Sequence, residues 1–393
     1  MSWDPLSPEQ RELRELVRTV AREVVAPRAA EIDASHTFPW DVVEAFREAG
    51  LFGLFFEEED GGTGTGVLLS LVAIEEISRV CATSGLILAV QELGSLGLKL
   101  AGSAEQRAAW LPRLASGEVL AAYALTEAGS GSDSAAMRST ARPDGDGWVL
   151  DGTKRFITNA GVAGLYTVFA KTGPDAGHRG ISAFVVEAGT PGFEVARLEE
   201  KLGITGSTTG ELVFDGVRVG PESLLGEVGE GFRLAMRILD RSRPGVAAQA
   251  LGIAQGATDY ALEYARTRET MGRPIAQHQL IAGKLADMET STEAARGLLY
   301  RYGRMVDEGA HDDELTKASA MAKLYCGDVA MQVAVDAVQV LGGYGYVKEY
   351  PVERFLRDAK ITQIYEGSQE IQRIVIAREM LKETRTFLME GVG

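Results

Sequence analysis

The stretch QIYEGSQEIQ, residues 363–372, places a carboxylate where it could act as a base. Glu366 follows the apolar pair Ile364 and Tyr365, and it precedes Gly367 and an expected helix start at Ser368. A surface carboxylate stabilised by the helix dipole is the simpler structural alternative. The apolar neighbours favour at least partial burial, and desolvation raises a carboxylate's pKa toward the pH at which a general base works best. We therefore predict that Glu366 removes a proton from an organic substrate.

A second stretch, YALTEAGSGSDSAA at residues 123–136, is rich in very small side chains. Glycine and serine at 129–132 would let a flat ligand approach the backbone closely. Free N–H groups and hydroxyls could then bind ligand carbonyls or phosphates. From composition alone, an ordinary flexible loop explains this stretch equally well.

In a third stretch, RFITNA at residues 155–160, an aromatic side chain stands close to a hydroxyl. Phe156 could cover one face of a ring while Thr158 bonds to the edge of that ring. The end of an ordinary strand is the simpler explanation when this stretch is taken alone.

A fourth stretch, RTRETMGRPIAQHQ at residues 266–279, gathers basic residues in an acidic protein. Arg266, Arg268 and Arg273 could bind phosphate, because the guanidinium group offers a bidentate fork. A solvated helix end with surface ion pairs is the better explanation in isolation. His278 is more readily explained as a hydrogen-bonded structural residue than as a ligand.

The bulk composition narrows the class of protein. With 393 residues, 45% of them hydrophobic, the chain can bury a large core and form more than one domain. A net charge of −16 works against nonspecific nucleic-acid binding. The two cysteines fit neither a metal site nor a disulfide framework. Neither a signal peptide nor an apolar run of about 18 residues is visible, so we expect a cytoplasmic protein with no membrane partner.

Helical patterns flank a β-rich middle. Helical spacing predicts helices over residues 7–33, 40–49, 67–80, 84–101 and 104–115. Short β-branched and aromatic stretches follow from about residue 120 and suggest a small barrel or sandwich. Helices return from about residue 230, with further segments at 276–308, 314–341 and 368–388. Pro244 should kink or break the first of these helices.

Taken together and in order, these stretches resemble the acyl-CoA dehydrogenase family over nearly the whole chain. ALTEAGSGSD at 124–133 looks like the first family signature, and the run from QVLGGYGY to YEGSQEIQ at 339–372 looks like the second. The stretches at 57–66 and 200–219 are also similar to family segments. The resemblance implies a mostly α protein with a central β-barrel domain. Its helical domain would span 1–120, its β domain 121–229 and its C-terminal four-helix bundle 230–393.

The resemblance also implies the chemistry. Members desaturate acyl-CoA thioesters between the α and β carbons, using FAD that lies between domains and partly against a neighbouring subunit. Glu366 would take the α-proton while the β-hydrogen leaves as hydride to flavin N5, and the Glu366 backbone N–H would hold the thioester carbonyl. A homotetramer, built as a dimer of dimers, and electron transfer to electron-transferring flavoprotein are expected.

Other site residues follow by position in the family motifs. The implied flavin contacts are Tyr123, Leu125, Thr126, Gly131, Ser132, Phe156, Ile157, Thr158, Ser368 and Gln369. The implied contacts to a partner subunit's FAD are Arg268, Gln279, Gln339, Gly342 and Gly343. The implied substrate contacts are Ser132, Asp240, Arg243 and Gly367, and no metal is implied. Many relatives have tryptophan at position 156, so Phe156 changes the stacking surface without removing it.

The position of the base sorts subfamilies. Isovaleryl-type and long-chain members carry a glutamate where this chain has Ser242, and they lack the glutamate of the YEG motif. This chain has serine at 242 and Glu366, which is the layout of short-, medium- and short-branched-chain members. The side chains around residues 88–100 should set the acyl length, and we expect a short to medium, linear or branched chain.

Three alternatives share the fold. An acyl-CoA oxidase-like flavoprotein would pass electrons to oxygen, but typical oxidases are longer. A nitroalkane oxidase-like protein would carry aspartate in place of Glu366. A DNA-associated, largely non-catalytic member would carry a basic C-terminal extension, whereas this chain is acidic and ends in FLMEGVG.

Overall fold

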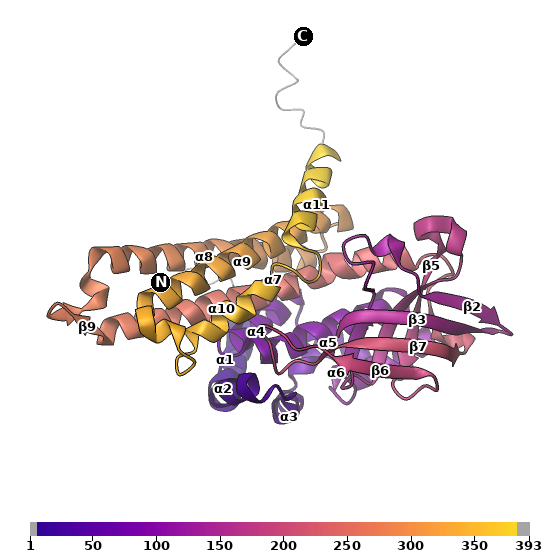
Figure 1. Cartoon of the computed structure of the whole chain (residues 1–393). Coiled ribbons are helices and arrows are strands. Elements are labelled where there is room, and N and C mark those ends of the chain that lie inside the picture. The colour runs from indigo at the N-terminus through magenta and orange to yellow at the C-terminus, as the bar shows by residue number, and fades with distance from the viewer. Residues whose placement is uncertain (1–5, 383–393) are drawn as a thin grey trace, which may run out of the picture.

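The computed structural model describes residues 6–382, and a helical body adjoins a β domain at one end (Figure 1). The N-terminal helices are α1 (Pro8–Val20), α2 (Ala26–Ser35), α3 (Trp40–Glu48), α4 (Val67–Ser78), α5 (Ala82–Ala101) and α6 (Ala104–Ala115), with a π-helical turn at Ala21–Val25. Ser7 caps α1 in a capping box with Gln10, whose backbone N–H donates to the Ser7 hydroxyl over 3.2 Å. The predicted helices of this region are confirmed.

The β domain forms an eight-stranded sheet in the order β6-β7-β3-β2-β4-β5-β8, with β1 parallel to β4. The strands are β1 (Ala121–Ala124), β2 (Thr140–Asp144), β3 (Gly147–Thr158), β4 (Leu165–Lys171), β5 (Ile181–Glu187), β6 (Phe193–Leu198), β7 (Thr209–Val219) and β8 (Leu224–Leu225). The register between β3 and β7 shifts between Lys154 and Ile157. A shift of this kind re-aims side chains, and here it lies within the RFITNA stretch.

The C-terminal helices are α7 (Gly231–Thr267), α8 (Gln279–Asp307), α9 (Asp312–Leu341), α10 (Val352–Ile361) and α11 (Gln369–Lys382). A hairpin of β9 (Glu269–Thr270) and β10 (Arg273–Pro274) joins α7 to α8. The predicted mostly helical protein with a central β domain is confirmed. The sequence did not predict α10 or the hairpin, and residues 383–388 of the predicted last helix lie outside the described residues.

The sequence predicted a kink or a break at Pro244, and the break does not occur, because α7 continues through the proline. Proline lacks the N–H that would bond to the carbonyl four residues earlier, which belongs to Asp240. The Tyr302 hydroxyl of α8 donates to that carbonyl over 3.3 Å. A side chain from the neighbouring helix thus replaces the missing hydrogen bond, and this replacement is not visible in the local pattern.

Close helix packing joins the N-terminal helices to the bundle. A Cβ added at Gly252 of α7 would meet the Glu75 carbonyl of α4 at 2.3 Å, and one added at Gly256 would meet the Arg79 carbonyl at 2.0 Å. Only glycine permits this approach at either position. Within residues 6–382, one helical stretch, Asp312–Tyr346, could cross a membrane by length and composition alone. Half of its most apolar window is buried inside the protein, as in a core helix.

Candidate active site

Glu366 lies in the connection between α10 and α11, in a left-handed backbone conformation that residues other than glycine rarely adopt. Its φ is +51°, and that of Gly367 is +93°. The side chain is half-buried, and its Oε2 accepts a hydrogen bond from the Ser242 hydroxyl of α7 over 2.7 Å. Burial raises the pKa of Glu366 to about 7, against the opposing effects of the Ser242 hydrogen bond and the Lys323 charge. The predicted partial burial is confirmed.

Side chains from three helices hold this connection. The Gly367 carbonyl accepts from Lys323 Nζ of α9 over 2.7 Å and from Gln372 Nε2 of α11 over 2.9 Å. The Tyr365 hydroxyl donates to the Gln249 side chain of α7. The Glu366 backbone N–H has no hydrogen-bond partner in residues 6–382, so it is available to a ligand. Sequence reasoning missed Lys323, although a lone lysine in the apolar run ASAMAKLYCGDVA is a usable signal.

A buried ion pair stabilises the predicted flavin loop, residues 123–136. Lys154 Nζ of β3 donates to Glu127 Oε1 over 2.8 Å and to the Leu125 carbonyl over 3.2 Å. The Glu127 carboxylate also accepts from the backbone N–H groups of Arg138 and Ser139, over 2.6 and 3.0 Å. The two ends of the small-residue loop are therefore held together. Gly129 and Gly131 are exposed, and an added Cβ at either would meet nothing within 4 Å, so a ligand can approach the backbone at these two glycines.

The other predicted flavin contacts adjoin this loop. The Arg155 backbone N–H donates to the Thr126 carbonyl over 2.8 Å, which joins the end of β3 to the loop. Phe156 has a φ of +59° and is 57% exposed, while Ile157 is buried and Thr158 half-buried. These residues therefore present an aromatic face beside an open backbone.

Tyr123 links the loop to Glu366. Its hydroxyl is buried and has no hydrogen-bond partner among the described residues. Burial raises the pKa of Tyr123, and the nearby negative charge of Glu366 raises it further. The loop, the end of β3 and the base therefore share one region. An exposed aromatic ring, open glycines and an unpartnered buried hydroxyl fit a flat, polar ring system such as a flavin.

The predicted substrate residues on α7 lie within one turn of Ser242. Arg243 is 4% exposed and pairs with Asp240, which also accepts from the Thr316 hydroxyl over 2.7 Å. The Nε atom of Arg243 has no partner among the described residues. Ser132 is exposed on the small-residue loop. Of these residues, Arg243 is the one whose charge acts on Glu366.

Of the last two predicted flavin contacts, Gln369 is more constrained than Ser368. Ser368 is half-buried, whereas Gln369 is buried. The Gln369 side-chain amide donates to the Leu324 carbonyl over 2.7 Å and to Asp328 over 2.9 Å, and its Oε1 accepts from Lys323 over 3.2 Å. The Gln369 side chain is therefore engaged with α9.

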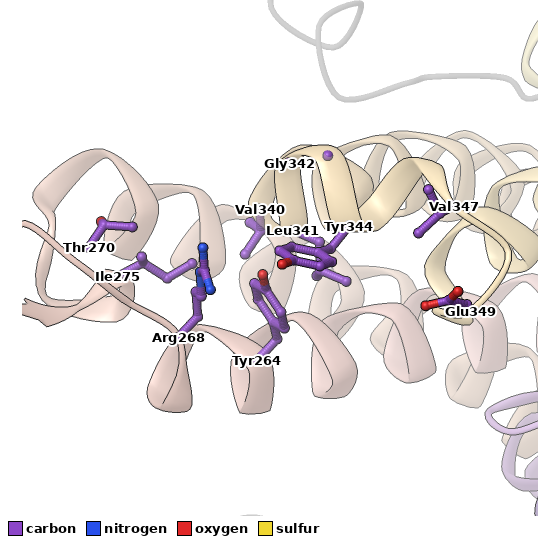
Figure 2. Close-up of a pocket in the computed structure, with 11 residues that line it drawn as sticks. Tyr264, Arg268, Thr270, Ile275, Val340, Leu341, Gly342, Tyr344, Val347 and Glu349 are labelled. Atoms are coloured by element: carbon purple, nitrogen blue, oxygen red, sulfur yellow. The ribbon is translucent and has the colours of Figure 1, made fainter.

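A second candidate region lies near the end of the helical body that is remote from the β domain (Figures 1 and 2). Figure 2 shows Tyr264 of α7 and Arg268, the residue that follows this helix, facing the turn after α9, which carries Gly342 and Tyr344. Together with Gly343 these residues line a cavity of about 590 Å³. The Arg268 guanidinium lies 5.4 Å from the centre of the Tyr344 ring. Residues far apart in sequence thus form one cavity, which is lined by aromatic rings, by Arg268 and by the acidic Glu349.

Other residues predicted for this region do not line the cavity. Gln279 and Gln339 are exposed at the start of α8 and near the end of α9. His278 hydrogen-bonds to Arg273 over 3.2 Å and to the Thr270 carbonyl over 3.2 Å. These bonds favour the structural explanation of His278. The aromatic residues Tyr264 and Tyr344 were not predicted, because their side chains meet only after the helices pack.

Comparison with known proteins identifies the family. Family models for the N-terminal, middle and C-terminal domains of acyl-CoA dehydrogenases match residues 7–118, 122–217 and 229–381. The chain belongs to the acyl-CoA dehydrogenase family. Cyclohexane-1-carbonyl-CoA dehydrogenase of Geobacter metallireducens is 48% identical over 379 residues, which cover 96% of this chain and 98% of that protein.

Solved structures agree with this family assignment. Butyryl-CoA dehydrogenase of Megasphaera elsdenii has a TM-score of 0.93 at 40% identity and covers 97% of this chain and 100% of its own. A solved chain from work on the electron transferring flavoprotein of Acidaminococcus fermentans has a TM-score of 0.94 at 42% identity. The match covers 98% of this chain and 100% of that chain. As an acyl-CoA dehydrogenase, this chain is a flavin oxidoreductase that acts on acyl-CoA and uses FAD.

Proposed function

We propose that this acyl-CoA dehydrogenase converts short- to medium-chain, linear or branched acyl-CoA thioesters to trans-2-enoyl-CoA, with Glu366 as the base. One observation carries the proposal. A half-buried glutamate in a left-handed turn, hydrogen-bonded to Ser242 and with its pKa raised to about 7, adjoins the residues suited to a flavin. The likeness to butyryl-CoA dehydrogenase supports the short-chain assignment.

The geometry suggests which groups of this chain accept the proton, orient the base and bind the thioester carbonyl. The Glu366 carboxylate accepts the α-proton, and Ser242 orients it through the 2.7 Å hydrogen bond. The free backbone N–H of Glu366 can donate to the thioester carbonyl and stabilise the negative charge that develops there. Bound FAD would supply the acceptor for the β-hydrogen, which leaves as hydride. Tyr123, the 126–132 loop and Phe156 would hold the ring, and Asp240, Arg243, Ser132 and Gly367 would contact the substrate.

The substrate range is tested by anaerobic titration of the purified yellow protein with saturated acyl-CoAs of increasing length. We expect the flavin absorbance to bleach with short- and medium-chain substrates, both linear and branched. If no acyl-CoA reduces the flavin, the dehydrogenase proposal fails. Oxygen uptake during turnover in air separates the proposed activity, which needs an electron carrier, from an oxidase activity.

The pH dependence of catalysis should report the state of Glu366. Because a protonated carboxyl cannot accept the α-proton, kcat/KM should fall below a pH of about 7, the value to which burial raises the pKa of this group. The fall should approach about tenfold for each pH unit on the acid side. Steady-state rates with one acyl-CoA between pH 5.5 and 9 measure this fall, the acid limb of the kcat/KM profile. A rate that stays constant down to pH 5.5 would exclude Glu366 as the titrating base.

The remaining assignments are also proposals. We propose that electrons pass to electron-transferring flavoprotein, a partner supported by the likeness to the chain from Acidaminococcus fermentans. We further propose a homotetramer, built as a dimer of dimers, in the cytoplasm, without a nucleic-acid or membrane partner. Domain boundaries near residues 120 and 229 complete the proposal. In the tetramer, Arg268, Gln279, Gln339, Gly342 and Gly343 would face the FAD of a neighbouring subunit.

Arg268→Ala tests this shared site. Loss of a charged hydrogen-bond donor to a phosphate should raise the Kd for FAD by about 10-fold or more, since such bonds contribute roughly 1.5–3 kcal/mol. Arg266→Ala is the matched control, because Arg266 is exposed on the same helix end and pairs with Glu263 at 4.0 Å. The measurement is the FAD-to-protein ratio after gel filtration, with fluorescence titration of the apoprotein. Equal FAD retention in the two variants would rule out the proposed role.

A further inference from the structure

Lys323 contacts the connection between α10 and α11, residues 362–368, which we call the base loop because it carries Glu366. Its side chain is fully buried in α9, which is rare for lysine. Its ammonium donates to the Gly367 carbonyl over 2.7 Å and to Gln369 Oε1 over 3.2 Å. Both acceptors flank the connection that carries Glu366. A neutral hydrogen-bonding residue would satisfy the same acceptors, so the buried charge itself needs an explanation.

The charged groups that act on Glu366 come from three helices, and a fourth helix adds a charge that acts on Lys323. Glu92 of α5 raises the pKa of Glu366, while Lys323 of α9 and Arg243 of α7 lower it. Burial, together with the charge of Arg243, lowers the pKa of Lys323 to about 7, while the charges of Glu366, of Asp328 on α9 and of Glu370 on α11 oppose this effect. The ammonium charge is therefore present on the acid side of that pH, where the carboxyl of Glu366 takes up its proton. Arg243 is already paired with Asp240. Within residues 6–382, Lys323 is therefore the cation that both contacts the base loop and interacts with Glu366.

The backbone of the loop explains why this contact matters. Glu366 and Gly367 have φ values of +51° and +93°, and a glutamate in this region is strained. The carbonyl of Gly367, the second of these two residues, accepts hydrogen bonds from Lys323 and Gln372. The Gly367 carbonyl lies in the peptide plane that joins Gly367 to Ser368, at the end of this turn, so holding it limits the movement of the adjacent residue that carries the carboxylate. A displacement of about 1 Å at such a place can cost about 10²-fold in rate.

We propose that Lys323 is a positioning residue for Glu366. It holds the Gly367 carbonyl so that the carboxylate stays beside Ser242, and its charge stabilises the ionised carboxylate that accepts the α-proton. This inference rests on the proposed role of Glu366 as the base. It assigns two separable effects to one side chain, a hydrogen bond that sets the geometry and a charge that sets the proton affinity.

Three substitutions separate these effects. Lys323→Met removes both the donor and the charge, Lys323→Gln keeps a donor but removes the charge, and Lys323→Arg keeps both. Lys323→Met should lower the rate of anaerobic flavin reduction by about 10²-fold. Lys323→Met and Lys323→Gln should move the acid limb of the kcat/KM profile up by about one pH unit, because a nearby cation favours the carboxylate. Lys323→Arg should leave that limb where the wild type has it.

Lys360→Met is the matched control, since Lys360 is exposed and contacts Gln363 of the same connection over 2.9 Å. It should change neither the rate nor the acid limb. FAD content and thermal unfolding establish that each variant is folded. If Lys323→Met does not fold, Lys323→Gln carries the test, because its amide can still donate to the Gly367 carbonyl.

The outcomes distinguish this inference from the function on which it rests. An unmoved acid limb in Lys323→Gln, or an equal shift in Lys323→Arg, would overturn the charge effect. A rate for Lys323→Met equal to that of Lys360→Met would overturn the positioning effect. If wild-type flavin is not reduced by acyl-CoA, or if Glu366→Gln keeps its activity, the proposed function itself fails. If acyl-CoA reduces the wild-type flavin and Glu366→Gln is inactive, a negative result with the Lys323 variants counts against the Lys323 inference alone.

Discussion

Glu366→Gln should lower the rate of flavin reduction by acyl-CoA by about 10³- to 10⁴-fold while FAD stays bound. The amide has nearly the shape of the carboxylate and can still accept a hydrogen bond from Ser242, which donates over 2.7 Å in the wild type. It cannot take up the α-proton. Stopped-flow absorbance under anaerobic conditions measures the step directly, and product-CoA binding shows whether the site remains intact.

Glu370→Gln is the matched control for this prediction, because Glu370 is an exposed carboxylate four residues along the chain. It should leave the rate unchanged. A near-normal rate in Glu366→Gln would move the base elsewhere. The pair Ser242→Glu with Glu366→Gly would then be informative, since the side chains of these two residues are in hydrogen-bond contact and a carboxylate from α7 could occupy the same region.

Lys154→Met should weaken both the β domain and FAD retention. Lys154 is fully buried and donates to Glu127 over 2.8 Å, beneath the small-residue loop. Removing one member of a buried ion pair typically costs about 3–5 kcal/mol, because the other charge loses its partner. Since the Glu127 carboxylate keeps its hydrogen bonds from Arg138 and Ser139, we expect about 3 kcal/mol. Denaturant unfolding and the FAD-to-protein ratio measure the two effects.

A double-mutant cycle controls for general damage to the core. Adding Glu127→Gln to Lys154→Met removes the unpaired carboxylate, so the double variant should recover part of the lost stability. Recovery of FAD binding should accompany it, because the amide oxygen can still accept from the backbone N–H groups of the loop. Strictly additive losses in the cycle would contradict the coupling of this pair to the loop.

The sequence predicted the parts of the structure that depend on local patterns. Helical periodicity located the N-terminal helices, the first of which the sequence predicted to start at residue 7, where Ser7 caps α1. The apolar residues before Glu366 predicted its partial burial. Pro244 does not break α7, and the Tyr302 hydroxyl that donates to the free Asp240 carbonyl comes from α8, which begins only at Gln279. Long-range compensation of this kind has no local signal.

The candidate site shows the same limit. Arg268 and the glycines Gly342 and Gly343 were predicted from separate motifs, and packing of α7 against the turn after α9 brings them to one cavity. The buried lysines Lys154 and Lys323 were missed, because a charged residue within a strand or helix is ordinarily interpreted as exposed. Their partners, Glu127 and the Gly367 carbonyl, are distant in sequence. Only the folded chain reveals these pairs.

The central claim is that Glu366 takes the α-proton, and hydrogen exchange measures this step alone. An acyl-CoA analogue with sulfur at the β-position has no β-hydrogen to transfer, so its α-hydrogens can only be removed and returned. In D₂O we predict that the wild-type enzyme incorporates deuterium at the α-carbon, as followed by NMR, and that Glu366→Gln does so at least about 10³-fold more slowly. Deuterium incorporation at the wild-type rate in Glu366→Gln would contradict the account.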